Sequence, residues 1–276
     1  MKSFALLTNV QMDEDFRVTR SIAEYILSRG GSCWVPPLGG DRFNDLSGME
    51  DKGIECAITL GGDGTFLNAA RRLRKMNIPL FGINIGNLGY LTSADLEDVP
   101  ACLDELMEGK YREESRMMLE GKVLHVSGET VTDTALNEIV INRAGVLRVV
   151  EFRIYINGEL LYTCDADGVI VSTATGSTGY NLSAGGPVIM PSANVMVVTP
   201  ICPHNLLCRS VVVPAGVCVR IEIGKRHKTM MEEADVTFDG TLAEKISIID
   251  SVQITVADQV TRILKRLDSG YFGIFR

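Results

Sequence analysis

The first hundred residues alternate between short apolar runs and stretches in which apolar residues recur at helical spacing. The unbroken runs are typical of buried strands, and they cover residues 3–8, 32–35, 56–60 and 79–83. The helical spacing predicts helices over residues 16–27, 66–76 and 98–109. Asp13 offers an N-cap for the first of these helices, and Gly30 with Gly31 offers its C-terminal stop. Strands that alternate with helices predict a doubly wound, mostly parallel sheet.

From about residue 111 the helical spacing fades and β-branched segments follow one another. Residues 150–156 alternate apolar and polar side chains, and Asn157-Gly158 then predicts a tight hairpin turn into a strand over 160–163. Further strands are expected over residues 169–172, 195–199, 210–213, 217–223 and 247–256. The sequence therefore predicts an α/β domain over 1–110 and a β-rich domain over 111–256, with the tail 257–276 packing back on the first domain.

Charge and apolar run length narrow the classes of function. The 276 residues carry 27 Lys and Arg against 35 Asp and Glu, a net charge of −8, and no basic stripe, so no nucleic-acid partner is expected. Residues 71–75 hold three arginines and a lysine on one predicted helix, either as a solvated face or as a patch that faces phosphates. The longest apolar runs are too short to cross a bilayer, so no membrane association is expected. The N-terminus lacks a secretory signal, which favours a cytoplasmic protein.

Residues 61–65, Gly-Gly-Asp-Gly-Thr, join a predicted strand to a predicted helix. Gly61, Gly62 and Thr65 suit a phosphate site, because glycines let the backbone approach an anion and a helix N-terminus presents free N–H groups. A carboxylate there would repel phosphates unless it held a cation or took a proton from a hydroxyl. Asp63 is therefore a candidate for phosphoryl-transfer chemistry; the alternative is a tight turn in which Asp63 only caps the helix.

Two further segments carry polar groups that a ligand would satisfy. Residues 173–186, which follow Asp167-Gly168 and a strand, are rich in hydroxyls and glycines, and such a loop is costly to order unless its groups find partners. Asn137 and Glu138 interrupt an apolar run, where they suit neighbouring ribose hydroxyls or, alternatively, a solvated strand edge.

Together these motifs resemble the NAD kinase family. The resemblance is carried by GGDGT at 61–65, GINIGNLGYLT at 82–92, NE at 137–138, DGVIVSTATGSTGYN at 167–181 and TPICPHNL at 199–206. It implies an α/β domain plus a β-rich domain, phosphorylation of the adenosine 2′-hydroxyl of NAD to give NADP, ATP as the phosphoryl donor, and a divalent cation, with Mg²⁺ as the default. It also implies a homodimer or homotetramer.

The resemblance assigns roles residue by residue. It implies that Asp63 is the catalytic proton acceptor. It implies contacts to the dinucleotide from Gly64, Tyr90, Asn137, Glu138, Asp165, Asp167, Thr178, Tyr180, Asn181 and Ser183.

Three positions depart from the family pattern. Asp165 stands where bacterial members often have arginine, which leaves the preference between NAD and NADH open. Gly179 stands where many members have alanine, and Thr241 stands where glutamine is common. Two other functions stay open: a GGDGT-type kinase of lipids or sugar phosphates, and a dinucleotide sensor without turnover. ATP or polyphosphate as donor, the oligomer and feedback regulation are not decided by the sequence.

Overall fold

A computed structural model describes residues 1–37, 45–86, 89–144, 149–205, 207–224, 233–267 and 270. The chain falls into two compact units. Unit 1 comprises Met1–Ser115 and Val260–Arg276, and unit 2 comprises Arg116–Gln259.

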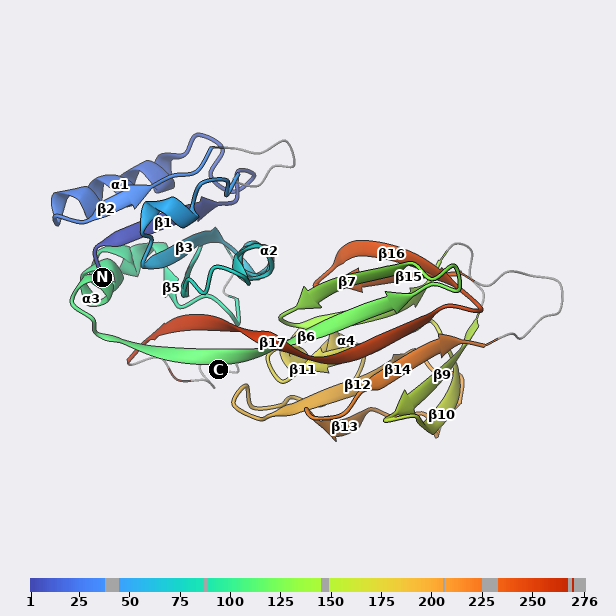
Figure 1. The fold of residues 1–276 in the computed structure, drawn as a ribbon. Coiled ribbons are helices and arrows are strands. Elements are labelled where there is room, and N and C mark those ends of the chain that lie inside the picture. Colours follow the sequence, from blue (N-terminus) through green and yellow to red (C-terminus); the bar gives the residue numbers. More distant parts are fainter. Residues whose placement is uncertain are drawn as a thin grey trace. The chain divides into compact units, whose positions relative to one another are not determined.

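Unit 1 is built on a mostly parallel sheet with helices between its strands (Figure 1). In chain order its elements are β1 (Ser3–Thr8), α1 (Arg17–Ser28), β2 (Ser32–Trp34), η1 (Glu50–Lys52), β3 (Cys56–Gly61), α2 (Asp63–Leu73), β4 (Leu80–Asn84), β5 (Ala94–Asp95), η2 (Leu96–Asp98) and α3 (Val99–Met107). The strands lie in the order β4-β3-β1-β2, all parallel. Because β1 has β2 on one side and β3 on the other, the connections reverse direction at the β1–β3 pair, and their carboxyl ends form a topological switch point.

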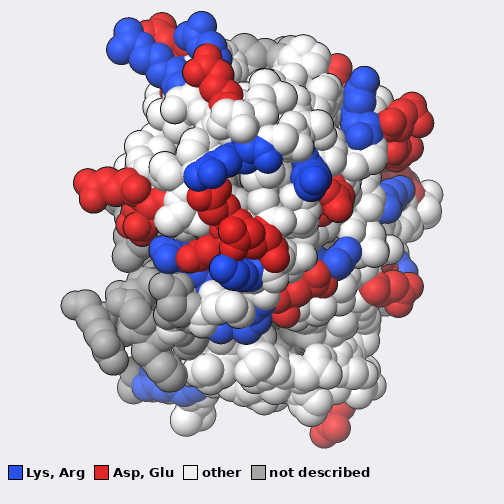
Figure 2. Space-filling model, turned by 90° about the vertical axis from the view of Figure 1, so that its left-hand side faces the viewer, with Lys and Arg blue, Asp and Glu red and all other residues white. Residues whose placement is uncertain are grey.

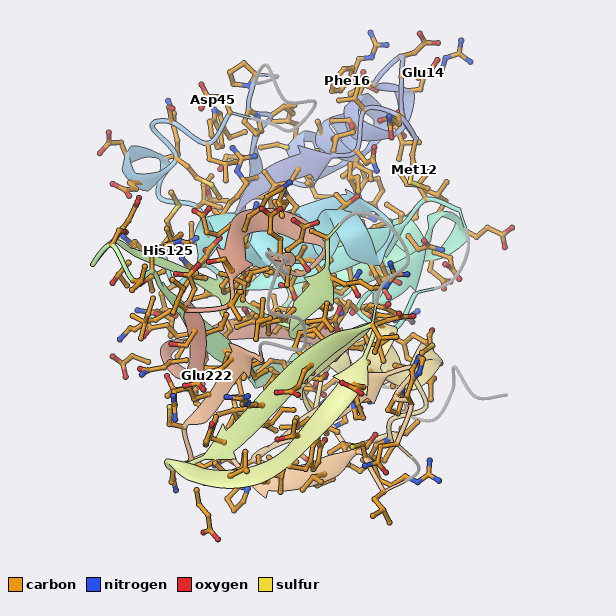
Figure 3. The ribbon with its side chains drawn as sticks, turned by 90° about the vertical axis from the view of Figure 1, so that its right-hand side faces the viewer. Met12, Glu14, Phe16, Asp45, His125 and Glu222 are labelled. Atoms are coloured by element: carbon orange, nitrogen blue, oxygen red, sulfur yellow. The ribbon has the colours of Figure 1, made fainter. Side chains whose placement is uncertain are left out.

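The start of α1 differs from the prediction. Asp13 is not the N-cap residue; the helix begins at Arg17, and Phe16 occupies the N-cap position in a left-handed conformation with φ 53° and without a side-chain cap. The Asp13 carboxylate nevertheless accepts the N–H groups of Val18 and Thr19, at 3.1 and 2.9 Å, and so satisfies donors of the first turn from four residues farther back. Figure 3 marks Met12, Glu14 and Phe16 on this segment.

Unit 2 consists of two packed antiparallel sheets. Its elements are β6 (Tyr111–Leu124, which starts in unit 1), β7 (Thr130–Ala135), β8 (Glu138–Arg143), β9 (Val150–Ile156), β10 (Glu159–Ala166), β11 (Gly168–Thr173), η3 (Gly176–Thr178), α4 (Tyr180–Ser183), β12 (Val195–Ile201), β13 (Val211–Pro214), β14 (Val219–Ile223), β15 (Glu233–Phe238), β16 (Thr241–Ser247) and β17 (Ser251–Arg266, which ends in unit 1). One sheet has the order β13-β12-β11-β8-β15-β16, and the other contains β10-β9-β14-β17 with β6 and β7. The core between them holds fully buried side chains such as Ile139, Phe152 and Phe238.

The structure confirms the predicted fold class, an α/β part followed by a β-rich part. It also confirms the hairpin at Asn157-Gly158, where both turn residues have positive φ, 50° and 86°. In the β-rich part the prediction missed β6, β7, β8, β15 and β16. It also treated residues 247–256 as one strand, although β16 ends at Ser247 and β17 runs on to Arg266.

Among the described residues, no helix has the length and apolar character needed to cross a bilayer. On the face shown in Figure 2, Lys and Arg are interspersed with Asp and Glu.

Candidate active site

The GGDGT segment lies at the switch point of unit 1. Gly61 ends β3 and Asp63 begins α2, so the predicted strand–turn–helix is present, and the helix starts three residues earlier than expected. Asn9, just after β1, donates from Nδ2 to Thr65 Oγ1 at 3.3 Å and so ties the end of β1 to the first turn of α2. A Cβ at Gly61 would lie 2.3 Å from Thr65 Oγ1, so only glycine fits this turn. Ligands in open α/β sheets bind at the carboxyl ends of the strands at such a point.

The Asp63 carboxylate is held by the loop that follows β4. Its Oδ2 accepts the N–H of Tyr90 at 2.9 Å and its Oδ1 accepts the N–H of Leu91 at 3.0 Å. From the other side, Lys265 Nζ donates to the carbonyls of Leu91 and Thr92 at 2.9 and 3.1 Å. Each carboxylate oxygen keeps a second acceptor position, so Asp63 is oriented and still able to take a proton.

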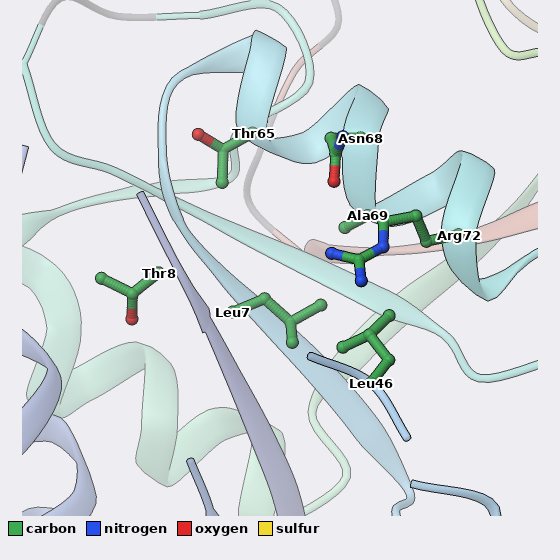
Figure 4. A pocket seen from close by; sticks show the side chains of 7 residues that line it. All are labelled: Leu7, Thr8, Leu46, Thr65, Asn68, Ala69 and Arg72. Carbon is green, nitrogen blue, oxygen red and sulfur yellow. The ribbon is translucent and has the colours of Figure 1, made fainter. Parts of the chain in front are cut away.

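A pocket opens beside this segment on unit 1 (Figure 4). Thr65, Asn68, Ala69 and Arg72 of α2 line it, together with Leu7 and Thr8 of β1 and Leu46. Arg72 belongs to the cationic cluster that the sequence left open between a solvated face and a phosphate-facing patch. Its position in the lining of the same pocket as Thr65 favours the second interpretation for this one residue.

Asn137 and Glu138 lie at the start of β8 in unit 2. They are not on a solvated strand edge, because β8 lies between β11 and β15 and Glu138 is only 8% exposed. Asn137 Oδ1 and Glu138 Oε2 are buried and have no hydrogen-bond partner among the described residues. Buried polar atoms in native proteins are nearly always paired, so these two oxygens indicate a partner outside the described part of the chain, and a bound ligand would supply one.

Glu138 is electrostatically unusual. Burial, and to a lesser extent the neighbouring Asp239 carboxylate, raise its pKa from 4.5 to about 8. A carboxyl with this pKa holds a proton near neutral pH and can either donate a hydrogen bond or change its charge when a ligand binds.

The hydroxyl-rich segment after β11 wraps around Asn137. Thr173 Oγ1 donates to the Leu136 carbonyl at 2.7 Å, and the Thr173 N–H donates to the Asn137 carbonyl at 2.8 Å. A Cβ at Gly176 would lie 2.2 Å from the Asn137 carbonyl oxygen, so glycine is required for this close approach. The segment is therefore mostly an ordered support for the Asn137–Glu138 pair and not a surface connector.

The other predicted residues of this segment fall into two groups. Asn181 is fully buried, and its amide is used inside the protein: Nδ2 donates to the carbonyls of Ser177 and Pro187, and Oδ1 accepts from Thr199. Tyr180 and Ser183 are exposed, and Thr178 is partly exposed. Asn181 is thus placed to hold the loop, and the exposed side chains are placed to meet a ligand.

Asp167 is not brought to Glu138. Ser172 pairs with Glu138 at one end of the β8–β11 ladder, and Gly168 pairs with Asn142 at the other. Five residues of strand separate Glu138 from Arg143, about 17 Å at ~3.3 Å per residue. Asp167 Oδ1 accepts from Arg143 Nε at 2.8 Å, and the backbone of Asp165 in the same region accepts the N–H of His204 at 2.8 Å.

A divalent cation would not find a preformed cage. Among the residues that the structure describes, no three His, Cys, Asp or Glu side chains gather at a metal-binding distance. Mg²⁺ usually keeps several waters and is bound by one or two carboxylates plus substrate phosphates, so the donor set is compatible with a cation that arrives with a nucleotide.

Sequence reasoning missed three residues of these sites. Asn9 and Arg143 stand alone in the sequence, without a motif around them. Asp239 is about a hundred positions from the pair it contacts, although Asp239-Gly240 is itself a recognisable hairpin signal. Parts of the motifs, Asn87, Leu88 and Leu206, and also His227, lie outside the described residues.

Comparisons with known families match nearly the whole chain. The family profile for the ATP-NAD kinase N-terminal domain matches residues 8–111, and that for the ATP-NAD kinase C-terminal domain matches residues 136–266. The chain is 41% identical to the NAD kinase of Lachnospira eligens, over 96% of this chain and 95% of that protein. It is 38% identical to the NAD kinase of Lachnoclostridium phytofermentans, over 100% of this chain and 98% of that protein.

Solved structures show the same fold. The yeast NADH kinase complexed with NADH superposes with a TM-score of 0.83 at 22% identity, covering 98% of this chain and 84% of that one. An NAD kinase from Archaeoglobus fulgidus in complex with ATP gives a TM-score of 0.76 at 24% identity, covering 97% of this chain and 94% of that one.

Proposed function

Because the chain belongs to the NAD kinase family, we propose that it transfers the terminal phosphoryl group of ATP to the adenosine 2′-hydroxyl of NAD, giving NADP and ADP. Membership of this family is the evidence for the activity. The observation that carries the residue assignment is the position of Asp63 at the carboxyl end of β3 and the N-terminus of α2, with both oxygens oriented by the loop after β4.

Asp63 is the proton acceptor in this reaction. The ribose oxygen bonds to the phosphorus of the transferred group, the bond from that phosphorus to ADP breaks, ADP leaves with the electron pair, and the hydroxyl proton passes to Asp63. Gly61, Gly62 and Thr65 approach the phosphates through backbone and hydroxyl donors. A divalent cation held by the donor phosphates, with at most one or two carboxylates such as Asp63, would neutralise phosphate charge.

Unit 2 supplies the dinucleotide contacts. Asn137 and Glu138 present the two buried oxygens that lack partners within the described part of the chain, and such oxygens suit ribose hydroxyls. Tyr180, Ser183 and Thr178 are open to a ligand, and Asn181 supports the loop from inside. Gly64 and Tyr90 are further dinucleotide contacts that the family resemblance implies. We further propose that the units correspond to the two domains predicted at 1–110 with 257–276 and at 111–256.

Assembly is proposed as a homodimer or homotetramer. Asp165 and Asp167 lie about a strand length away from Glu138 in the same chain, and a second copy of the chain would offer another route for both groups to contact one dinucleotide. Sedimentation of the purified protein tests assembly. Mixing an Asp167→Ala with a Glu138→Ala preparation under subunit exchange would restore part of the activity if sites are shared, and would restore none if they are not.

The test of the activity is NADP formation from NAD, ATP and Mg²⁺, with Asp63→Asn as the matched variant. The parent enzyme should form NADP, and the variant should lose roughly 10²- to 10⁴-fold in kcat, the usual contribution of a general base, while still binding NAD in calorimetry. Lipid or sugar phosphorylation without NADP would establish a different kinase. Tight NAD binding without turnover for any donor would establish a sensor.

A further inference from the structure

One carboxylate in unit 2 clamps the backbone that carries Asn137 and Glu138. Asp239 Oδ2 accepts the N–H of Leu136 at 2.7 Å. Its Oδ1 accepts the N–H groups of Asn137 and Glu138 at 2.8 and 3.1 Å. The Asp239 N–H in turn donates to the Glu138 carbonyl at 3.1 Å. Three consecutive N–H groups therefore converge on a single side chain about a hundred residues away in sequence.

The turn that contains Asp239 does not itself need a carboxylate. Phe238 pairs with Thr241, so Asp239 and Gly240 are the two turn residues, and both have positive φ, 46° and 75°. Asn-Gly satisfies this turn as well as Asp-Gly does. The negative charge at position 239 is thus additional to what the hairpin requires, and its carboxylate accepts the N–H groups of residues 136–138.

The clamped pair is the pair that presents unsatisfied oxygens. Asn137 Oδ1 and Glu138 Oε2 are buried without partners among the described residues. Gly179, from the segment after β11, leaves space beside them: a Cβ there would lie 3.3 Å from both Asn137 Nδ2 and Glu138 Oε2. Small shifts of the 136–138 backbone would move both oxygens together.

We propose that Asp239 is a positioning residue for the dinucleotide: by fixing the backbone of residues 136–138 it aims Asn137 Oδ1 and Glu138 Oε2 at the bound ribose. The proposal rests on the proposed function, since it assumes that NAD binds at this pair. It adds a residue that touches neither the substrate nor the phosphates.

Asp239 also acts on Glu138 through its charge. Among the described residues, Ser172 on β11, Gly179, Asn137 and Asp239 lie next to Glu138. Of these only Asp239 is charged, and its field adds to the effect of burial in raising the pKa of Glu138. Removal of this charge should therefore ease ionisation of Glu138, a change that a purely structural defect would not produce.

The test compares Asp239→Asn with Asp250→Asn. Asparagine keeps the turn chemistry at 239 and removes the charge and part of the acceptor capacity. Asp250 provides a matched control at the opposite end of the β15–β16 hairpin, where Ser247 pairs with Glu233. Its carboxylate likewise accepts two backbone N–H groups, from Val126 and Ser247, and lies beside His125, which is marked in Figure 3.

Asp239→Asn should raise KM for NAD about tenfold, the equivalent of one weakened charged hydrogen bond, with KM for ATP and kcat close to those of the parent. The inflection that Glu138 causes in the pH dependence of KM for NAD should move to lower pH. Asp250→Asn should change neither quantity, whatever its effect on Tm. Asp239→Ser gives a second test of the same loss if the asparagine variant is unstable.

The proposal would be overturned if folded Asp239→Asn had the same KM for NAD as the parent enzyme and the same inflection in the pH dependence of that KM. Failure of the parent enzyme to form NADP would instead count against the proposed function. The two failures are distinguishable, because the first requires an active parent.

Discussion

Units 1 and 2 each place an aspartate under consecutive backbone N–H groups, but the two clamps leave different atoms for chemistry. In unit 1, Asp63 accepts the N–H groups of Tyr90 and Leu91 and is itself the candidate reactive group. In unit 2, Asp239 accepts three N–H groups, and the candidate ligand contacts are the side chains of the residues it holds.

The difference teaches how the same interaction can serve two purposes. A carboxylate at the start of a helix, with free lone pairs, is oriented by its clamp for proton transfer. A carboxylate in a hairpin turn that accepts several backbone N–H groups instead fixes the conformation of the residues that donate them. We therefore expect changes at the first clamp to reduce kcat and changes at the second to reduce dinucleotide affinity.

After Asp63→Asn itself, the largest effect should come from closing the space around Asp63. A Cβ at Gly89 would lie 2.1 Å from Asp63 Oδ1, so Gly89→Ala must displace the loop or the carboxylate. We expect a loss of roughly 10²-fold in kcat/KM, since small misplacements of catalytic groups cost this much. Steady-state kinetics together with Tm measures it.

Gly216→Ala is the control for this substitution. A Cβ at Gly216 would meet no atom within 4 Å, and it should leave kcat/KM near that of the parent. Normal turnover in folded Gly89→Ala would show that the observed placement of Asp63 is not needed for activity.

The pH dependence of the free energy of unfolding should distinguish the Asp239 clamp from the Asp63 clamp. The folded pKa of Glu138 is raised to about 8, from 4.5 in an unperturbed carboxyl, so the folded state holds a proton that the unfolded state releases between these values. The free energy of unfolding therefore falls as pH rises from about 4.5 to about 8, by an amount on the order of a few kcal/mol. Glu138→Gln removes this contribution and should flatten the pH dependence.

Denaturant unfolding at several pH values measures this effect, with the exposed Glu159→Gln as control. Asp239→Asn should give an intermediate slope, because burial remains and only the neighbouring charge is lost. Parallel curves for the parent and Glu138→Gln would contradict the assignment of a titrating Glu138.

The smallest effect is expected at Arg72. Its side chain lines the pocket beside Thr65, so Arg72→Ala should raise KM for ATP a few-fold, in keeping with ~1 kcal/mol for a partly exposed cation near phosphates, and leave KM for NAD unchanged. Lys75→Ala, from the same cationic cluster but exposed beyond the end of α2, is the control. An equal change in KM for ATP in both variants would show that the cationic cluster is a solvated helix face.

Local patterns were sufficient for much of this fold. Apolar runs located the parallel strands of unit 1, and Asn157-Gly158 located a hairpin, because each depends on neighbouring residues only. Residues 61–65 could be recognised as a strand-to-helix turn for the same reason. The burial of Asn181 and the separation of Asp167 from Glu138 depend on strand register and long-range packing, which no local pattern specifies.

The helix start at Arg17 shows the same limit on a smaller scale. Asp13 has the right chemistry for a cap, but the left-handed Phe16 lets the chain bend so that the carboxylate reaches Val18 and Thr19 from outside the helix. Asp239 shows the same limit over a longer range, because the N–H groups that it binds lie about a hundred residues away in sequence. The residue type suggested a cap for Asp13 and a hairpin turn for Asp239, and in both cases tertiary structure decides which N–H groups the carboxylate binds.

The most direct test of the account is a side-by-side measurement of kcat and NAD dissociation constant for Asp63→Asn and Asp239→Asn. The account predicts that Asp63→Asn loses kcat and keeps NAD affinity, and that Asp239→Asn loses NAD affinity and largely keeps kcat. If both variants lost the same quantity to the same extent, the two clamps would serve one purpose, and the division of roles drawn here would be wrong.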